Sequence, residues 1–270
     1  MGREIDPDAQ SDEEDERPGA SDEDAEAADD RGADSSPGRR RARWEISPRR
    51  LRIFELALVL LVTFGSSLLG AFWNWWTGDL GAGAPSVRGL INGIQRQVVE
   101  LALLAYVLFR RGQTFRDLGL SCRWIDLPAG GLLYVAMMMA DSFAHDSINW
   151  LTLAATDHPA SFAPSHAHYA GVAAITLTLI YAVIDPVNEE LIVRAFTMTE
   201  IAQLTGSTAL AIAASVGLQT AYHLYQGLPN ALSRGAAFLV AACFYARFRR
   251  ILPVILAHVL WDLVVVLRHI

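Results

Sequence analysis

The chain has 270 residues, 52% of them hydrophobic, and a formal net charge of −7. Its two cysteines, Cys122 and Cys243, are too few for a disulfide scaffold or a thiolate zinc site, which excludes the small disulfide-rich and zinc-ribbon classes. The acidic N-terminus lacks the basic and then apolar pattern of a cleavable signal peptide, so none is expected.

The first 45 residues differ in composition from the rest of the chain. Residues 1–38 hold 15 of the 29 acidic residues and three arginines, whereas the remainder holds 14 acidic residues and 19 arginines. This stretch has one large aliphatic residue, Ile5, and no aromatic residue, so it cannot bury enough apolar surface to offset the entropy of ordering. We predict a disordered acidic tail over residues 1–45 that ends in the arginine cluster at 39–43. No nucleic-acid binding is expected, because an arginine cluster before a hydrophobic helix is typical of the cytoplasmic side of a membrane protein.

Seven apolar segments predict a helical membrane protein. The first runs from Leu56 to Trp73 without a charge, and tryptophans at its end are typical of a membrane interface. The others lie at 91–110, 127–147, 168–186, 208–226, 231–247 and 251–268. A bilayer core of about 30 Å takes about 20 helical residues, and a soluble domain of this size cannot bury so many such segments. We therefore expect an all-α protein with seven or eight transmembrane helices, multi-pass in the cell membrane.

Segment 187–206 decides between the two counts. It carries three glutamates and an arginine in otherwise apolar sequence. Counted as a crossing, it gives eight spans and places the basic cluster at 247–250 outside. If the segment is left out, the chain has seven spans, and that cluster lies on the same side as the basic clusters at 39–52 and 110–116. This arrangement satisfies the positive-inside rule and places the N-terminus in the cytoplasm. Pro186 predicts a break or kink in the preceding helix, just before the glutamates.

Ionisable side chains at membrane depth are costly, so each of them is a candidate functional group. Arg96 and Glu100 stand one helical turn apart and predict a structural ion pair. A second group, expected at the interface end of the third segment, consists of Asp141, His145 and Asp146. A third group, expected in a polar loop and without metal-ligand spacing, consists of His158, His166 and His168.

The strongest candidates begin with Glu189, Glu190 and Arg194. On a helix, Glu190 and Arg194 are i, i+4 neighbours and can form a bidentate pair. Glu189 lies about 100° further round the helix axis and need not share that partner. Its carboxylate is therefore suited to the work of a general base.

Three further candidates lie nearer the C-terminus. His223 follows a predicted apolar helix, and His258 and Asp262 stand i, i+4 on the last apolar segment. Any one of these groups has an ordinary explanation in helix packing. Their concentration in the last third of the chain, on three separate segments, favours a site, because a buried glutamate with two histidines and a carboxylate can activate water and stabilise an oxyanion.

At these residues the sequence resembles the CPBP family of intramembrane endopeptidases, also called the type II CAAX protease, Abi or bacteriocin-processing family. The family motifs E-E-x-x-x-R, F-x-x-x-H and H-x-x-x-N/D are matched, in this order, at Glu189, Glu190 and Arg194, at His223, and at His258 and Asp262. The second motif is matched only at its histidine, because Gln219 stands at the Phe position. Order and spacing agree over residues 168–268, which we interpret as a CPBP-type catalytic membrane core after N-terminal transmembrane helices over residues 51–150.

The resemblance implies an all-helical intramembrane endopeptidase, a hydrolase of the CAAX prenyl protease type. In such a site Glu189 and His223 activate water for attack on the scissile carbonyl, and His258 with the Asn/Asp position stabilises the oxyanion. Because an ionised carboxylate cannot donate a hydrogen bond, Asp262 must orient His258, be protonated or help to hold a cation. No cofactor is expected, with a divalent metal such as zinc as the open alternative.

The expected partners are a membrane-associated peptide or protein substrate and the lipid bilayer. The alternative function is that of a non-catalytic bacteriocin-immunity or membrane scaffold protein that keeps the CPBP fold. A transporter that uses the same buried charges as a proton relay is disfavoured, because no inverted repeat of broken helices is evident in the sequence.

Overall fold

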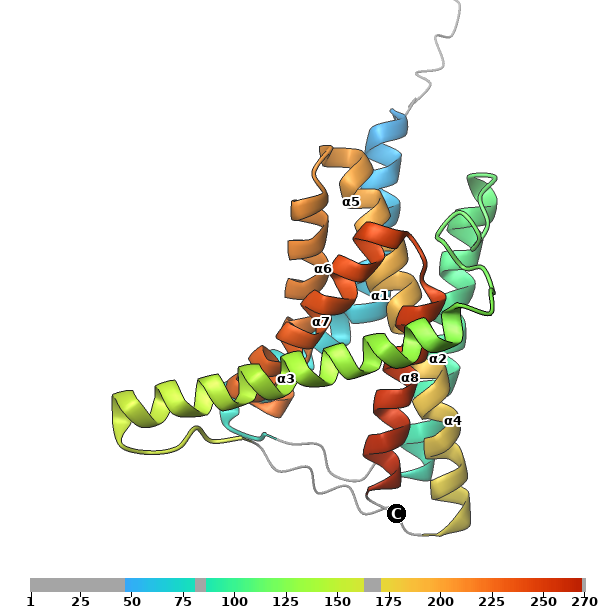
Figure 1. Cartoon of the computed structure of the whole chain (residues 1–270). Helices are drawn as coiled ribbons and strands as arrows, with labels where there is room; N and C mark the ends of the chain where they lie inside the picture. The colour runs from blue at the N-terminus through green and yellow to red at the C-terminus, as the bar shows by residue number, and fades with distance from the viewer. Residues whose placement is uncertain (1–46, 81–85, 163–170, 269–270) are drawn as a thin grey trace, which may run out of the picture. The chain divides into compact units, whose positions relative to one another are not determined.

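The computed structural model describes residues 47–80, 86–162 and 171–268, and every regular element in them is helical. The predicted all-α fold is confirmed for this part of the chain. The elements are α1 (Pro48–Thr77), α2 (Val87–Arg110), α3 (Asp126–Thr156), α4 (Val172–Glu189), η1 (Glu190–Phe196), α5 (Thr197–Thr205), α6 (Thr208–Tyr222), η2 (Leu224–Gln226), α7 (Leu228–Phe248) and α8 (Leu252–Leu267) (Figure 1). The predicted acidic tail with its arginine cluster, His166 and His168 lie outside the described residues.

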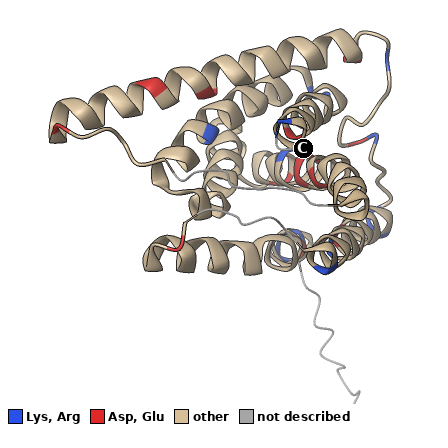
Figure 2. Ribbon diagram, turned by 90° about the horizontal axis from the view of Figure 1, so that it is seen from below, with Lys and Arg blue, Asp and Glu red and all other residues tan. Residues whose placement is uncertain are grey.

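Four helical stretches of the described chain are long and apolar enough to cross a membrane. They are Pro48–Thr77, Asp126–Thr156, Val172–Thr205 and Leu228–Phe248, while α8 is apolar but shorter. Most turns of the described helices carry no charged residue (Figure 2), and large apolar side chains such as Leu69 and Phe143 are 75% and 76% exposed. Such exposed apolar surface is typical of contact with lipid. These helices support a multi-pass membrane protein, although the expected seven or eight spans are not confirmed.

The helix that bears the glutamates does not break at Pro186. α4 runs through Pro186 to Glu189 and continues directly as the π-helix η1 and then as α5, so that Val172–Thr205 forms one stretch of 34 residues. Of the predicted break or kink, the break is wrong, and segment 187–206 is the second half of this helix and no separate crossing. Packed neighbouring helices allow a membrane helix to tolerate proline, and π-helical turns of the kind that follows here are frequent at functional sites.

Three of the basic clusters meet at one end of the described helices. Arg52 of α1 and Arg111 after α2 both pair with Glu200 of α5, at 3.0 and 2.8 Å. Arg249, after α7, donates to the hydroxyl of Thr199 on α5 at 2.8 Å. The start of α1, the chain after α2, the first turn of α5 and the chain after α7 therefore lie together, as the seven-span count with all three clusters on one side requires.

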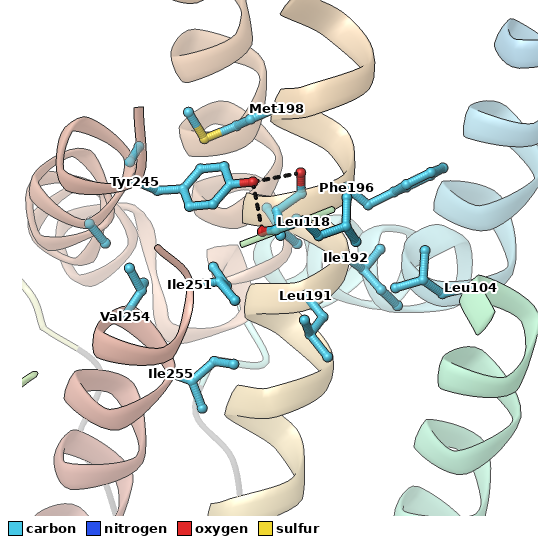
Figure 3. Close-up of a cluster of buried hydrophobic side chains, with 14 of the residues drawn as sticks. Leu104, Leu118, Leu191, Ile192, Phe196, Met198, Tyr245, Ile251, Val254 and Ile255 are labelled. Atoms are coloured by element: carbon cyan, nitrogen blue, oxygen red, sulfur yellow. Dashed lines mark hydrogen bonds between the residues drawn. The ribbon is translucent and has the colours of Figure 1, made fainter. Parts of the chain in front are cut away.

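Every residue of η1 is buried, and the hydrophobic core is built around it (Figure 3). Tyr245 of α7 reaches this helix, and its hydroxyl donates to the backbone carbonyls of Leu118 and Ala195, at 3.1 and 3.3 Å. On the α2 side, Leu104 is fully buried in the same core. The turn that carries Glu190 is thus held from several sides, which fixes the position of the candidate site next to it.

Candidate active site

The structure brings all six predicted site residues together from three helices. Glu189 and Glu190 lie where α4 passes into η1, and Arg194 follows within η1. His223 caps the C-terminal end of α6, and His258 and Asp262 stand on α8. Direct contacts link the glutamates to α8 and to the last turn of α6.

Glu190 and Arg194 form the predicted ion pair, with 3.1 Å between Oε2 and Nε, and both side chains are fully buried. Arg194 also donates to the hydroxyl of Ser215 at 2.8 Å and to the side-chain oxygen of Gln219. A buried charge is tolerated when it is paired and hydrogen-bonded in this way. The guanidinium therefore holds Glu190 and α6 in place and has no surface left for a substrate.

Glu190 also binds the last helix through His258. The distance between its Oε1 and Nδ1 of His258 is 2.9 Å. Since a carboxylate only accepts, Nδ1 donates, and this orients the ring so that Nε2 lies 3.9 Å from Oδ1 of Asp262. Asp262 lies beside this ring, which fits a role in orienting His258.

His223 is held by the backbone of its own helix. Its Nδ1 lies 2.8 Å from the carbonyl oxygen of Gln219, and a carbonyl only accepts, so Nδ1 carries the hydrogen and Nε2 carries the lone pair. The ring packs against Tyr222 and Phe238, with centroids 4.7 and 5.0 Å away. This tautomer presents the nitrogen that a general base requires.

The two adjacent glutamates have different surroundings. Glu190 receives hydrogen bonds from Arg194, His258 and the amide of Gln219. Glu189 is half-buried and receives one bond, from the Gln219 amide at 3.3 Å. The buried hydroxyl of Tyr222 lies beside this carboxylate without reaching hydrogen-bond geometry. Glu189 therefore keeps free lone pairs that Glu190 has lost.

Two further polar residues beside the site were missed in the sequence. Asp185 lies one helical turn before Glu189 on α4, close enough to interact electrostatically with Glu189 and His258. Its Oδ1 accepts a hydrogen bond from Gln97 of α2, which is fully buried. The criterion of ionisable residues at membrane depth would have found Asp185 but not the uncharged Gln97.

The predicted pair of Arg96 and Glu100 is present, with 3.4 Å between Nε and Oε1. Glu100 also accepts a hydrogen bond from the amide of Asn188, so the pair joins α2 to the helix of the glutamates. Arg96 also donates to the hydroxyl of Ser67 on α1 at 3.4 Å, so the pair contacts a third helix.

The third apolar segment extends further than predicted. α3 continues to Thr156, so Asp141, His145 and Asp146 lie within the helix and not at its end, because the apolar pattern resumes after them. Asp141 pairs with Arg234 of α7 at 3.4 Å, and the ring of His145 stacks on Phe162. His158 is exposed, as a loop histidine is expected to be.

The described residues do not fit a metal centre. No group of three or more His, Cys, Asp or Glu side chains in the part of the chain that the structure describes is arranged to hold a metal ion. His258 and His223 each use Nδ1 for a hydrogen bond, so each ring offers one nitrogen at most.

A family model described as type II CAAX prenyl endopeptidase Rce1-like matches residues 171–264. The matched segment contains all six predicted site residues and the helices from α4 to most of α8. No curated protein and no solved structure matches the chain. This match over residues 171–264 supports the resemblance to the CPBP family that the motifs indicate.

Proposed function

We propose that the protein is an intramembrane endopeptidase that hydrolyses a peptide bond in a membrane-associated peptide or protein. The family match supports a membrane protease at the level of the family. The observation that carries the proposal is the contrast between the two glutamates. Glu190 accepts from three donors and serves the structure, whereas Glu189 accepts from Gln219 and keeps lone pairs for the proton of a water molecule.

In the proposed reaction, water attacks the scissile carbonyl carbon while Glu189 takes one of its protons. His223 orients this water through the lone pair on Nε2. When the tetrahedral intermediate collapses, the C–N bond breaks and the proton passes from Glu189 to the leaving amine. The products are a new carboxyl group and a new amine.

The oxyanion of the intermediate requires a hydrogen-bond donor. Nε2–H of His258 is that donor when the ring carries both protons, since Nδ1 remains bonded to Glu190. The carboxylate of Asp262, 3.9 Å from Nε2, stabilises the resulting positive charge. We propose that no cofactor takes part.

The proposed setting is the lipid bilayer, with the arginine clusters at the cytoplasmic face. The rule that basic residues flank membrane helices on the cytoplasmic side supports this orientation, because the clusters around Arg52, Arg111 and Arg249 lie at one end of the described helices. The N-terminus is then cytoplasmic.

The test compares purified, detergent-solubilised wild type with Glu189→Gln and His223→Ala on a library of membrane peptides, with cleavage read by mass spectrometry. Asp126→Asn is the matched control, since Asp126 is a buried carboxylate whose polar partners, Arg250 and the backbone of Arg123, lie outside the site residues. We expect cleavage by the wild type and the control, loss in both site variants and no effect of a chelator. A folded wild type that cuts nothing would support the non-catalytic alternative, and sensitivity to chelator would indicate a metal.

A further inference from the structure

We propose that Gln219 is a positioning residue of this site, which holds the Glu189 carboxylate through its side chain and His223 through its backbone. The inference rests on the proposed function, because it assigns a task in water activation. Gln219 lies on α6, one turn before His223, and is fully buried. It stands at a position where the motif of the family has Phe, a residue that makes no hydrogen bond with its side chain.

The orientation of the Gln219 amide follows from the chemistry of its partners. Arg194 donates to the side-chain oxygen, and a guanidinium has no acceptor. The nitrogen lies 3.3 Å from Oε2 of Glu189 and 3.4 Å from Oε1 of Glu190, and carboxylates have no donor. The opposite orientation of the amide would therefore leave all three contacts unfavourable.

Only an amide of this length satisfies both sides of the site. A glutamate here would keep the acceptor for Arg194 but would place a third carboxylate against Glu189 and Glu190. Methionine or phenylalanine would offer neither donor nor acceptor, and would leave buried polar partners unsatisfied. The residue that departs from the family motif is thus matched to the arginine on one side and the glutamates on the other.

The same residue controls both groups proposed to activate water. Its amide donates to Oε2 of Glu189 at 3.3 Å. Its backbone carbonyl accepts from Nδ1 of His223 at 2.8 Å and so selects the tautomer with a free Nε2. Loss of the amide would leave the Glu189 carboxylate free to rotate, and a displacement of about 1 Å in such a group can cost roughly 100-fold in rate.

The experiment measures kcat, KM and the pH profile of Gln219→Met and Gln219→Glu on a peptide that the wild type cleaves. Methionine keeps the length and removes all three hydrogen bonds of the side chain. Glutamate keeps the acceptor for Arg194 and replaces the donor to Glu189 and Glu190 with a third carboxylate. Ser215→Ala is the matched control, because Ser215 lies on the same helix, is fully buried and bonds Arg194 but not Glu189.

We expect kcat to fall by roughly 10- to 100-fold in both Gln219 variants with KM within about twofold of the wild type. In Gln219→Met the acid limb of the profile moves to higher pH, because a carboxylate that loses a donor is protonated more easily. Ser215→Ala lowers thermal stability but keeps the profile. A wild-type kcat and profile in both Gln219 variants, or the same changes in Ser215→Ala, would overturn the positioning role.

The contact between Gln219 and Glu189 can also be measured if the proposed function fails. If the folded wild type cleaves nothing, the infrared carboxylate band of Glu189, identified by difference against Glu189→Gln, still reports the contact. A shift of this band in Gln219→Met, with none in Ser215→Ala, supports the positioning role without reference to activity. A band that does not move overturns it.

Discussion

Nδ1 of His258 lies 2.9 Å from Oε1 of Glu190, so the last helix is bonded directly to the π-helix in the middle of Val172–Thr205. The contact joins two of the family motifs through a carboxylate that Arg194 already neutralises. Glu190 therefore holds the helices together. The other glutamate, Glu189, remains available for chemistry, and the two glutamates are expected to respond differently to substitution.

Glu190→Gln should be strongly destabilising, because it leaves the guanidinium of Arg194 buried without a counter-charge. Removal of one partner from a buried ion pair costs about 3–5 kcal/mol. Glu189→Gln should abolish cleavage while the unfolding temperature stays close to that of the wild type. Thermal unfolding of both variants in detergent checks this difference, and an equal loss of stability in the two would contradict it.

Asp262→Ala should lower kcat by about 100-fold, the cost of losing one element of oxyanion stabilisation. The carboxylate lies 3.9 Å from Nε2 of His258 and is proposed to orient that ring. Asp262→Asn should keep most of the activity, since the family motif accepts either residue and an amide can itself donate. Single-turnover rates of the two variants separate the outcomes, and a wild-type rate in Asp262→Ala would argue against a role for the side chain.

Asp185→Asn should change the pH dependence of cleavage more than its maximal rate. The substitution removes a negative charge near Glu189, while the new amide oxygen can still accept from Gln97. With one neighbouring negative charge fewer, Glu189 gives up its proton more easily, so the acid limb of the profile should move to lower pH. A profile identical to that of the wild type would place Asp185 outside the electrostatics of the site.

Glu200→Ala should destabilise the protein without changing the cleavage rate of the folded fraction. Glu200 is buried and pairs with Arg52 and Arg111, which ties α5 to α1 and to the chain after α2. Because the Arg52 side chain is one-third exposed, the expected loss is only about 2–3 kcal/mol. Chemical denaturation together with the activity per folded molecule checks both parts, and a lower rate per folded molecule would connect this cluster to the site.

Local patterns made part of the structure predictable. The pairs of Glu190 with Arg194 and of Arg96 with Glu100 are i, i+4 neighbours, so helix geometry alone brings them together. The all-helical membrane class followed from apolar segments in the same way, because each segment satisfies its own backbone hydrogen bonds as a helix.

The uninterrupted course of the helix at Pro186 was not predictable in this way. Proline opposes helix continuation locally, and the packing of neighbouring helices around η1 decided the outcome. The extension of α3 beyond its predicted end has a similar origin, since the pairing of Asp141 with Arg234 of α7 stabilises a charge within the helix.

The sequence by itself determined the helical membrane class, the family motifs and the identity of the candidate residues. Only the tertiary structure decided that His258 binds Glu190, and that Gln219 joins Arg194 to both glutamates. These partners lie tens of residues apart in the chain, so their contact depends on how α6 and α8 pack against the helix of the glutamates. A motif spacing describes one helix, whereas a hydrogen bond between helices depends on the distance and rotation of both.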